Sequence, residues 1–368
     1  MGIFGLDKGD EVMAVRSFGI IKDPYSLDFN NCGKSIINSL PRPVLVVSTV
    51  VGKGIYSVAE AICERFDSQE GIYHVTIEEL LTENALNEEY KRYRLISNYF
   101  PFLLNLVYRI PIFYYRKLLR EKYLRVTSLD KLQEKMDSLG IKSVICSSHR
   151  PAFWFSCLKY RTKSDFVLFG MLSEFGRSLG WKYIFWDMMD GYLSPINREA
   201  LDFPFPSALR YIQVEPPCKT QFFNLAQIKA DKNRVLFVAG HWGQIFINKA
   251  KRIIVDLLSG FPELQVHVVC GTNEKLYVRL SGYFKGNQRV VVYHEEVSLL
   301  GLMTQCASII TKPGIATLLE AGAAQRKVFL LKGMPVAEDN NARYAMVRYG
   351  AEWFNLKNYK EWHDSMIG

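Results

Sequence analysis

Three glycine-containing turns hold the residues whose types and spacing could bind a phosphate group. One lies in ITKPGIATLLEAGAA at 310–324, which predicts the end of a strand, a Pro-Gly turn and the start of a helix. Pro313 fixes the backbone angle φ, Gly314 frees the turn, and the N–H groups from Gly314 to Thr317 would point at a ligand near the positive end of the helix. A diphosphate fits such a place. Glu320, six residues after Gly314, could then accept hydrogen bonds from a ribose. The alternative is an ordinary strand-to-helix turn with Glu320 on an exposed helix face.

The two other turns also combine glycine with the start of a helix. STVVGKGIYSVAEAI at 48–62 places Gly52 and Gly54 two residues apart, which lets the backbone approach an anion or a sugar. AGHWGQIF follows a predicted strand that ends at Ala239, and His241 stands beside Gly240. Neither turn identifies its ligand alone, but both predict a helix N-terminus that favours an anion.

These turns follow short apolar runs that alternate with helical patterns. Nearly continuous apolar runs are typical of parallel strands that are buried on both faces. The predicted strands are 43–50, 143–148, 182–188, 234–240, 264–271, 289–294, 307–312 and 327–333, and the main predicted helices are 57–66, 129–138, 245–259, 297–305 and 315–324. The repeated strand–helix units predict an α/β fold with two doubly wound domains. Ligands of such sheets bind beyond the carboxyl ends of the strands, which is where the three turns lie.

The length of the chain also indicates two domains. A chain of 368 residues with 49% hydrophobic content exceeds what one core usually supports. The best boundary is the segment 214–234, where two prolines and a polar stretch precede a new strand. We therefore predict an N-terminal extension at 1–42, an N-terminal domain at 43–225 and a C-terminal domain at 226–368.

Composition favours a cytoplasmic protein with neither disulfides nor a metal site. The seven cysteines are an odd number and form no C-x-x-C pair, which fits reduced thiols better than a disulfide framework or a zinc site. The first residues carry charges where a signal peptide needs an apolar run, and no segment reaches 18 uncharged apolar residues. No D-x-D motif for a divalent ion is evident. The net charge of +9 permits anionic partners.

Much of the basic charge lies in one aromatic segment, 91–126. It holds nine Lys or Arg residues against one acid, Glu121, interleaved with nine Phe or Tyr residues. Rings at headgroup depth and cations over phosphates suit an anionic bilayer, so we expect peripheral membrane association. Single-stranded nucleic acid also binds aromatic residues among cations, but no RNA-binding motif accompanies them, and nucleic acid is not expected as a partner. The alternative is a helical pair that packs against its own domain.

Several segments together resemble the monogalactosyldiacylglycerol synthase and processive diacylglycerol glucosyltransferase family, which is related to MurG and has the two-domain GT-B architecture. The similarity runs from about Pro43 to Trp353. Its segments are STVVGKGIYSVAEAI, NYFPFLLNLVYRI, SSHRPAF and DMMDGYLSP in the N-terminal half and VVCGTNEKLYVRLSGYF, ITKPGIATLLEAGAA and MPVAEDNNARYAMVRYGAEW in the C-terminal half. Their order in one chain is specific, although no single segment would suffice.

The resemblance implies a UDP-sugar donor that is bound mainly by the C-terminal domain as a co-substrate, without a cofactor or a metal ion. An N-terminal domain that binds the acceptor at the membrane is implied as well. The positions that match the family's donor-binding residues are Thr311, Lys312, Pro313, Gly314 and Thr317 for the diphosphate, Glu320 for the ribose, Glu338 and Asn341 for the sugar, Gly240 and His241 closing over the donor phosphates, and Gly52 and Gly54 in the first loop.

Three positions depart from the family pattern, and one of them is Ile315, which replaces the second glycine of the Pro-Gly turn. Ile55 replaces the histidine of the first loop, which is commonly taken as part of the acceptor-side machinery, and Ala337 replaces a glutamine that precedes the sugar-facing acid. Since isoleucine cannot accept a proton, a catalytic base must come from elsewhere. His149 in SSHRP is the first candidate, because neutral imidazole removes protons near pH 7 and its family counterpart faces the interdomain cleft. Asp187 is the alternative, together with Asp190. Structural roles remain open for all three.

The function that these features predict is transfer of a sugar from a UDP-sugar to a lipid or other hydrophobic acceptor. Glycosyl transfer needs a deprotonated acceptor and a stabilised leaving diphosphate, and fixed N–H dipoles supply the second without a metal. The alternatives are a catalytically silent relative that binds nucleotide or lipid, which Ile55 and Ala337 favour, and a UDP-sugar epimerase of the same fold.

Overall fold

A computed structural model describes residues 32–50, 53–81, 128–175, 180–181, 184–198, 205–241, 245, 247–294, 297–333 and 337–366. The predicted N-terminal extension up to residue 31 and the basic aromatic segment 91–126 lie outside the described residues, and so does Gly52.

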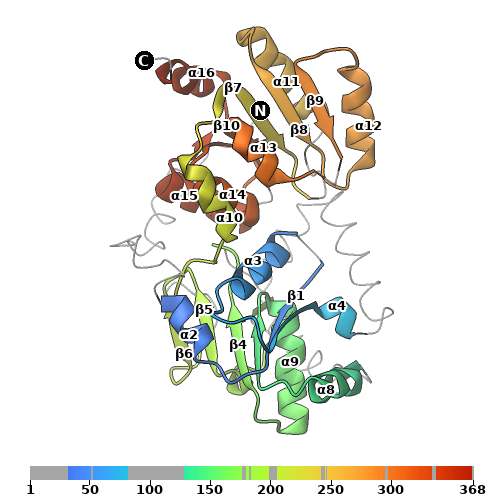
Figure 1. The fold of residues 1–368 in the computed structure, drawn as a ribbon, viewed down its shortest axis with the longest axis vertical. Helices are drawn as coiled ribbons and strands as arrows, with labels where there is room; N and C mark the ends of the chain where they lie inside the picture. Colours follow the sequence, from blue (N-terminus) through green and yellow to red (C-terminus); the bar gives the residue numbers. More distant parts are fainter. Residues whose placement is uncertain are drawn as a thin grey trace, which may run out of the picture.

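The first half of the chain forms a parallel sheet of six strands in the order β2-β1-β3-β4-β5-β6 (Figure 1). The strands are β1 Val44–Ser48, β2 Ile72–Thr76, β3 Ser143–Cys146, β4 Val167–Met171, β5 Gly191–Ser194 and β6 Arg210–Gln213. The helices are α2 Lys34–Asn38, α3 Lys53–Cys63, α4 Ile77–Leu80, α8 Ser128–Ser138 and α9 His149–Thr162.

The second half forms another parallel sheet of six strands in the order β12-β11-β10-β7-β8-β9. The strands are β7 Asp231–Val238, β8 Gln265–Val269, β9 Val290–Tyr293, β10 Cys306–Thr311, β11 Lys327–Leu330 and β12 Glu352–Trp353. The helices are α10 Thr220–Phe223, α11 Ile247–Gly260, α12 Glu274–Tyr283, α13 Leu299–Gln305, α14 Ile315–Ala323, α15 Ala337–Tyr349 and α16 Leu356–Ser365. The predicted α/β fold with two doubly wound parallel sheets is therefore confirmed, whereas the domain boundary stays a prediction.

The apolar strands are covered on both faces, as their sequence predicts. All five residues of β1 are buried. Val44 and Val46 belong to one hydrophobic cluster, and Leu45 and Val47 belong to another. Alternate side chains of a strand point to opposite faces of the sheet, so each face of β1 packs against its own layer of helices. β7 of the second sheet alternates between two clusters in the same way.

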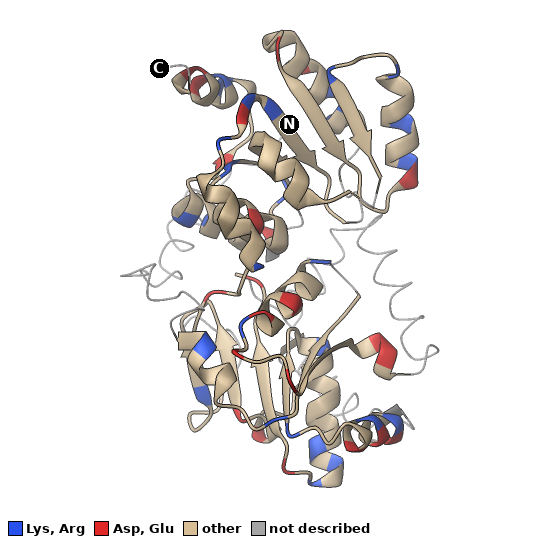
Figure 2. Ribbon diagram, in the orientation of Figure 1, with Lys and Arg blue, Asp and Glu red and all other residues tan. Residues whose placement is uncertain are grey.

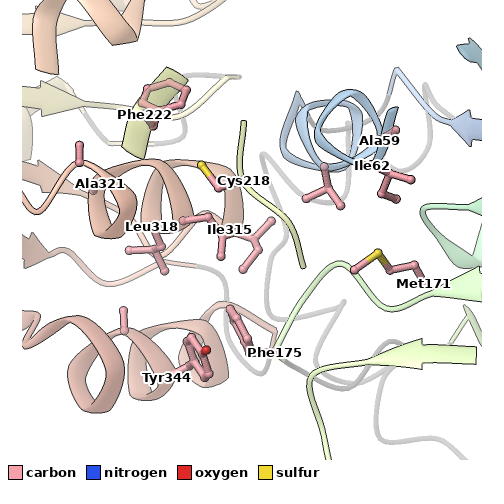
Figure 3. Packing of buried hydrophobic residues seen from close by; sticks show 14 of the residues in the cluster. Ala59, Ile62, Met171, Phe175, Cys218, Phe222, Ile315, Leu318, Ala321 and Tyr344 are labelled. Carbon is pink, nitrogen blue, oxygen red and sulfur yellow. The ribbon is translucent and has the colours of Figure 1, made fainter. Parts of the chain in front are cut away.

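One of these clusters passes from the first sheet into the second. It joins residues of β1 and α3 to residues of α14 and α15, and Figure 3 shows Ile62 of α3, Met171 of β4, Ile315 of α14 and Tyr344 of α15 within it. The two sheets are thus held against each other by a shared apolar core rather than by a single connecting segment.

The prediction of a strand at 182–188 is wrong. Within the described part of that stretch, Trp186–Met188 forms a 3-10 helix, and β5 begins only at Gly191. The Trp186 ring packs edge-on against Tyr192, with 5.4 Å between the ring centroids, and lies 6.1 Å from the ring of Trp181. The apolar run is therefore buried as an aromatic cluster beside the sheet. The other seven predicted strands coincide with β1, β3 and β7 to β11.

Candidate active site

The turn between β10 and α14 has the form that the sequence predicts. β10 ends at Thr311 and α14 begins at Ile315, with Gly314 as the N-cap residue in an extended conformation. Among the described residues no side chain caps this helix, and its first turn carries no acid. The first N–H groups of a helix have no partner within the helix, so those of α14 are oriented toward a ligand site. This is the arrangement that binds phosphate at helix N-termini.

The first loop of the N-terminal half lies against this helix N-terminus. A Cβ atom placed on Gly54 would lie 3.1 Å from Cγ2 of Ile315 and 3.6 Å from the backbone nitrogen of Ala316. A larger residue would therefore push α3 away from α14. The sequence predicted substrate binding at both turns, and the structure brings Gly54 and the start of α14 together.

Glu320 is buried where α3 meets α14. Its side chain is 8% exposed, and the Ser57 hydroxyl of α3 donates a hydrogen bond of 3.2 Å to Oε1. The other oxygen, Oε2, is buried and has no hydrogen-bond partner among the described residues. Burial raises the pKa of Glu320 to about 7. The alternative reading of Glu320 as an exposed helix residue is wrong, because α3, from far earlier in the chain, covers it. Figure 2 shows acidic positions in both α3 and α14.

Lys312 and Glu338 form an ion pair next to the turn. The Nζ atom of Lys312 donates to Oε1 of Glu338, and both side chains are largely buried. The aliphatic part of Lys312 crosses Gly240, since a Cβ there would lie 2.5 Å from Cε of Lys312. Gly240 has a φ of +79°, a left-handed conformation that also favours glycine. The loop at Gly240 and the turn at Lys312 are thus in contact, as donor-binding segments would be.

Asn341 connects the turn to the N-terminal half. Its Nδ2 donates to the carbonyl oxygen of Pro313 at 3.1 Å, and its Oδ1 accepts from the N–H of Phe175 at 2.9 Å. The Phe175 ring stacks on Tyr344 of α15, with 3.4 Å between centroids, and Figure 3 shows the two rings side by side. Asn341 therefore positions the turn, and its amide is engaged by protein groups on both sides.

Three other residues predicted to bind the donor lie in or next to these turns. The Thr311 hydroxyl donates to the carbonyl oxygen of Val238 at 3.2 Å, which fixes the end of β10 to β7. The carbonyl oxygen of His241 accepts from the N–H of Thr272 at 2.7 Å. Thr317 lies in the first turn of α14 and is partly buried.

His149 lies at the carboxyl end of β3, as predicted, but its ring packs against the N-terminal half itself. A Cβ on Gly180 would lie 1.9 Å from Cδ2 of His149, and the ring stands edge-on to Trp181 at 6.5 Å. Burial and the positive charge of Arg150 lower the pKa of His149 to about 4. The imidazole is neutral at pH 7 but has little affinity for a proton.

Asp187 is not brought to these residues. It is exposed on the 3-10 helix that precedes β5. Asp190, three residues later, accepts from the N–H of Leu168 at the start of β4 and pairs with Lys159 at 2.6 Å. This segment therefore lies at the amino edge of the first sheet, whereas the predicted donor residues gather at the carboxyl edges.

Glu174 is a residue that the sequence analysis missed. It follows β4 directly and precedes Phe175, so it lies at the junction of the two halves. Burial and the negative charge of Glu338 raise the pKa of Glu174 to about 7, while Lys312 lowers it. The apolar run VLFGM before it could have revealed this position, because loops that follow buried strands hold the ligands of such sheets.

The described residues contain no group of three or more His, Cys, Asp or Glu side chains arranged to hold a metal ion. None of the described helices combines the length and apolarity that a membrane crossing requires. All seven cysteines lie in described residues as free thiols.

Comparisons with known proteins show which sequences and folds this chain is similar to. No family model matches the chain. A processive diacylglycerol beta-glucosyltransferase of Bacillus thuringiensis (strain Al Hakam) is 27% identical over 315 residues, which cover 82% of this chain and 79% of that protein. The same enzyme of Bacillus anthracis (strain CDC 684 / NRRL 3495) is similar to the same extent.

Two solved structures share the fold. MurG of Acinetobacter baumannii matches with a TM-score of 0.52 at 10% identity, over 89% of this chain and 91% of that one. Os79 from O. sativa, solved in complex with U2F and trichothecene, matches with a TM-score of 0.54 at 9% identity, over 88% and 90%. The predicted resemblance to diacylglycerol glucosyltransferases, the GT-B fold and the enzyme class of glycosyltransferase are confirmed.

Proposed function

We propose that this protein transfers a sugar from a UDP-sugar to a lipid or other hydrophobic acceptor at the cytoplasmic surface of a membrane. The similarity to diacylglycerol glucosyltransferases supports the acceptor class. The basic aromatic segment 91–126 supports binding to an anionic bilayer, because its cations and rings match phosphates and headgroup depth.

The single observation that carries the donor is Glu320 beside the uncapped start of α14. Glu320 lies five residues after Ile315, which is roughly 7.5 Å along a helix axis at about 1.5 Å per residue. A ribose hydroxyl could donate to the unpartnered Oε2 while the diphosphate accepts from the N–H groups of the first turn. A nucleoside diphosphate offers these two groups at comparable spacing.

The chemistry then needs little from the donor side beyond stabilising the leaving group. As the bond between the sugar and the diphosphate breaks, negative charge accumulates on the diphosphate. N–H dipoles that are already oriented stabilise this charge without reorganising. Gly54 and Gly240 allow the backbones of both halves to approach the donor closely.

Binding of UDP to wild type and to the variant Glu320→Ala tests the donor site. We expect the variant to bind UDP at least about tenfold more weakly, since a lost hydrogen bond to a charged group costs about 1.5 to 3 kcal/mol. Isothermal titration calorimetry measures this affinity. The exposed helix variant Glu134→Ala is the matched control and should bind as wild type does. Equal affinity in Glu320→Ala would remove Glu320 from the site.

Turnover tests the acceptor. Wild-type protein is incubated with a panel of UDP-sugars and with vesicles that contain diacylglycerol, with and without anionic phospholipid. We expect release of UDP and a glycosylated lipid, both faster on the anionic vesicles. UDP binding without turnover would contradict the proposal, and so would a sugar that is altered while still attached to UDP.

A further inference from the structure

Two carboxyl groups and one ammonium group gather where the loop after β4 meets the turn before α14. Lys312 belongs to the turn, Glu338 belongs to the first turn of α15, and Glu174 belongs to the loop. The charges of Lys312 and Glu338 both act on the Glu174 carboxyl. Phe175, the residue after Glu174, donates to Asn341, which holds Pro313 next to Lys312, so Glu174 lies at this site although it comes from the opposite half of the molecule.

The residues on either side of Glu174 fix its position. The Ser173 hydroxyl donates to the carbonyl oxygen of Ser147 at the end of β3, at 2.5 Å. The N–H of Phe175 donates to Asn341, which in turn holds Pro313 of the turn. One neighbour is thus anchored to the N-terminal half and the other to the C-terminal half. Glu174 is held between them, within one residue of the bonds that position the proposed diphosphate site.

The two carboxyl groups differ in their partners. Glu338 forms an ion pair with Lys312, so it already has a charged partner. Glu174 forms neither an ion pair nor a hydrogen bond with any residue that the structure describes. Since no described residue engages the Glu174 carboxylate, that carboxylate can accept a proton.

The other positions considered for the base are unsuitable, either by their chemistry or by where they lie. Ile55 has no group that accepts a proton. The His149 ring is packed against Gly180 and Trp181, and Asp187 lies at the amino edge of the first sheet. Glu174 comes from the N-terminal half and lies next to Phe175, which is joined to the turn before α14 through Asn341.

On the basis of the proposed function, we propose that Glu174 is the catalytic base that removes the proton from the acceptor hydroxyl. In this step the acceptor oxygen forms a bond to the anomeric carbon of the sugar, and the bond from that carbon to the diphosphate oxygen breaks. The electron pair of the broken bond leaves with UDP. The proton of the hydroxyl moves to the Glu174 carboxylate, from which it passes to solvent after products leave.

The electrostatic environment suits this role. A base works best when its pKa lies near the working pH, and the pKa of Glu174 is raised to about 7. Burial is the main cause, and the charged groups that act on it are Glu338 of α15, which raises the pKa, and Lys312, which lowers it. Glu174 must be ionised to act, so kcat should rise with pH up to about 7 and stay constant above it.

The variants Glu174→Gln and Glu174→Asp test the proposal in the full-length protein with a UDP-sugar and diacylglycerol vesicles. We expect Glu174→Gln to lower kcat by about 10² to 10⁴, which is the usual contribution of a general base, while KM for the UDP-sugar changes less than about threefold. We expect Glu174→Asp to recover part of the rate and to keep the rise of kcat with pH, which Glu174→Gln should lose. Glu263→Gln, an exposed loop variant, is the control.

The outcomes separate this proposal from the proposed function. If wild type transfers sugar and Glu174→Gln keeps its rate and its pH profile, Glu174 is not the base, although the glycosyltransferase function stands. A raised KM with unchanged kcat would likewise make Glu174 a binding residue. If wild type transfers no sugar to any vesicle, the proposed function fails and the role of Glu174 fails with it. Unchanged UDP affinity and thermal unfolding would show that Glu174→Gln is folded.

Discussion

Two of the contacts between the N-terminal half and the C-terminal half differ in how their buried polar groups are paired. At the first, α3 packs on α14, and the Glu320 carboxyl has one hydrogen bond, from Ser57, and one buried oxygen without a partner in the described structure. At the second, the connecting segment after β6 packs on α15. There Oε1 of Glu215 accepts from the hydroxyls of Tyr344 and Tyr349, each at 2.6 Å, and Arg348 lies 3.9 Å from Oε2.

This difference separates a structural contact from a ligand site. A buried polar group without a partner costs free energy, so a contact that only joins two domains has no reason to contain one. In the Glu215 contact Oε1 accepts two hydrogen bonds and Oε2 lies within ion-pair distance of Arg348, so this contact can hold the halves together. The Glu320 contact leaves an acceptor oxygen that a ligand hydroxyl could satisfy. We therefore expect variants of the Glu320 contact to change ligand affinity and the pH dependence of stability. Variants of the Glu215 contact should change stability alone.

The largest effect on stability is expected for Glu215→Ala. The substitution leaves two buried tyrosine hydroxyls and the Arg348 guanidinium without their acceptor, so the free energy of unfolding should fall by about 2 to 4 kcal/mol. Urea denaturation measures this loss, with the exposed variant Glu263→Ala as the control. UDP affinity of the folded variant should stay within about threefold of wild type. A larger loss of UDP affinity than of stability would mean that the Glu215 contact also serves the ligand.

The contrast between the two contacts also explains what could be predicted from the sequence. The turn at 312–314 was predicted because its determinants are local: an apolar run, then proline and glycine, then a helical pattern. The burial of Glu320 was not predicted, because it depends on Ser57, which lies 263 residues earlier in the chain. Likewise, Asn341 was expected to face a sugar, whereas its amide bonds Phe175 and Pro313, 166 and 28 residues away.

The omission of Glu174 and the choice of Asp187 both follow from one wrongly predicted strand. The aromatic run at 182–188 was predicted as a strand, so Asp187 was expected at a carboxyl edge. The true strands are β4, which ends just before Glu174, and β5, which begins after Asp187. Both strands need glycine for packing: a Cβ on Gly170 would meet Trp181 at 2.7 Å, and a Cβ on Gly191 would meet Phe169 at 2.3 Å. Glycine weakens the strand pattern in a sequence. The packing that requires glycine here involves residues distant in the chain, so the sequence alone does not show it.

An intermediate effect, which depends on pH, is expected for Glu320→Gln. The pKa of Glu320 is raised from 4.5 to about 7 in the folded protein, so the folded state binds a proton more tightly than the unfolded state does. This contribution to stability is fully present below about pH 4.5 and is lost as the pH rises to 7, with about 1.4 kcal/mol for each pKa unit. Glutamine cannot ionise, so the variant should gain about 2 kcal/mol over wild type between pH 5 and pH 8. Urea unfolding at both values measures it.

The control for this comparison is Glu134→Gln, because Glu134 is exposed on α8 and no shift of stability with pH is expected from it. At pH 8 and in saturating UDP, the bound ligand should stabilise wild type more than Glu320→Gln, because wild type binds it more tightly. The stability advantage of the variant should therefore be smaller with UDP than without it. An identical difference at pH 5 and pH 8 would show that the Glu320 carboxyl is not the group that titrates.

The smallest effect is expected for Ser57→Ala, which removes the hydrogen bond that the Glu320 carboxyl accepts within the described structure. The hydroxyl stabilises the ionised carboxylate, so the loss in unfolding free energy should be about 1 kcal/mol at pH 8 and smaller at pH 5, where Glu320 is protonated. Ser259→Ala is the matched control, because Ser259 is an exposed serine in α11 and the gain in helix propensity is the same. Since Ser57 holds Glu320 only from the side of α3, UDP should bind the variant as well as wild type or slightly better. A loss of UDP affinity equal to that of Glu320→Ala would instead place Ser57 among the ligand's contacts and would make the α3 side of this junction part of the donor site.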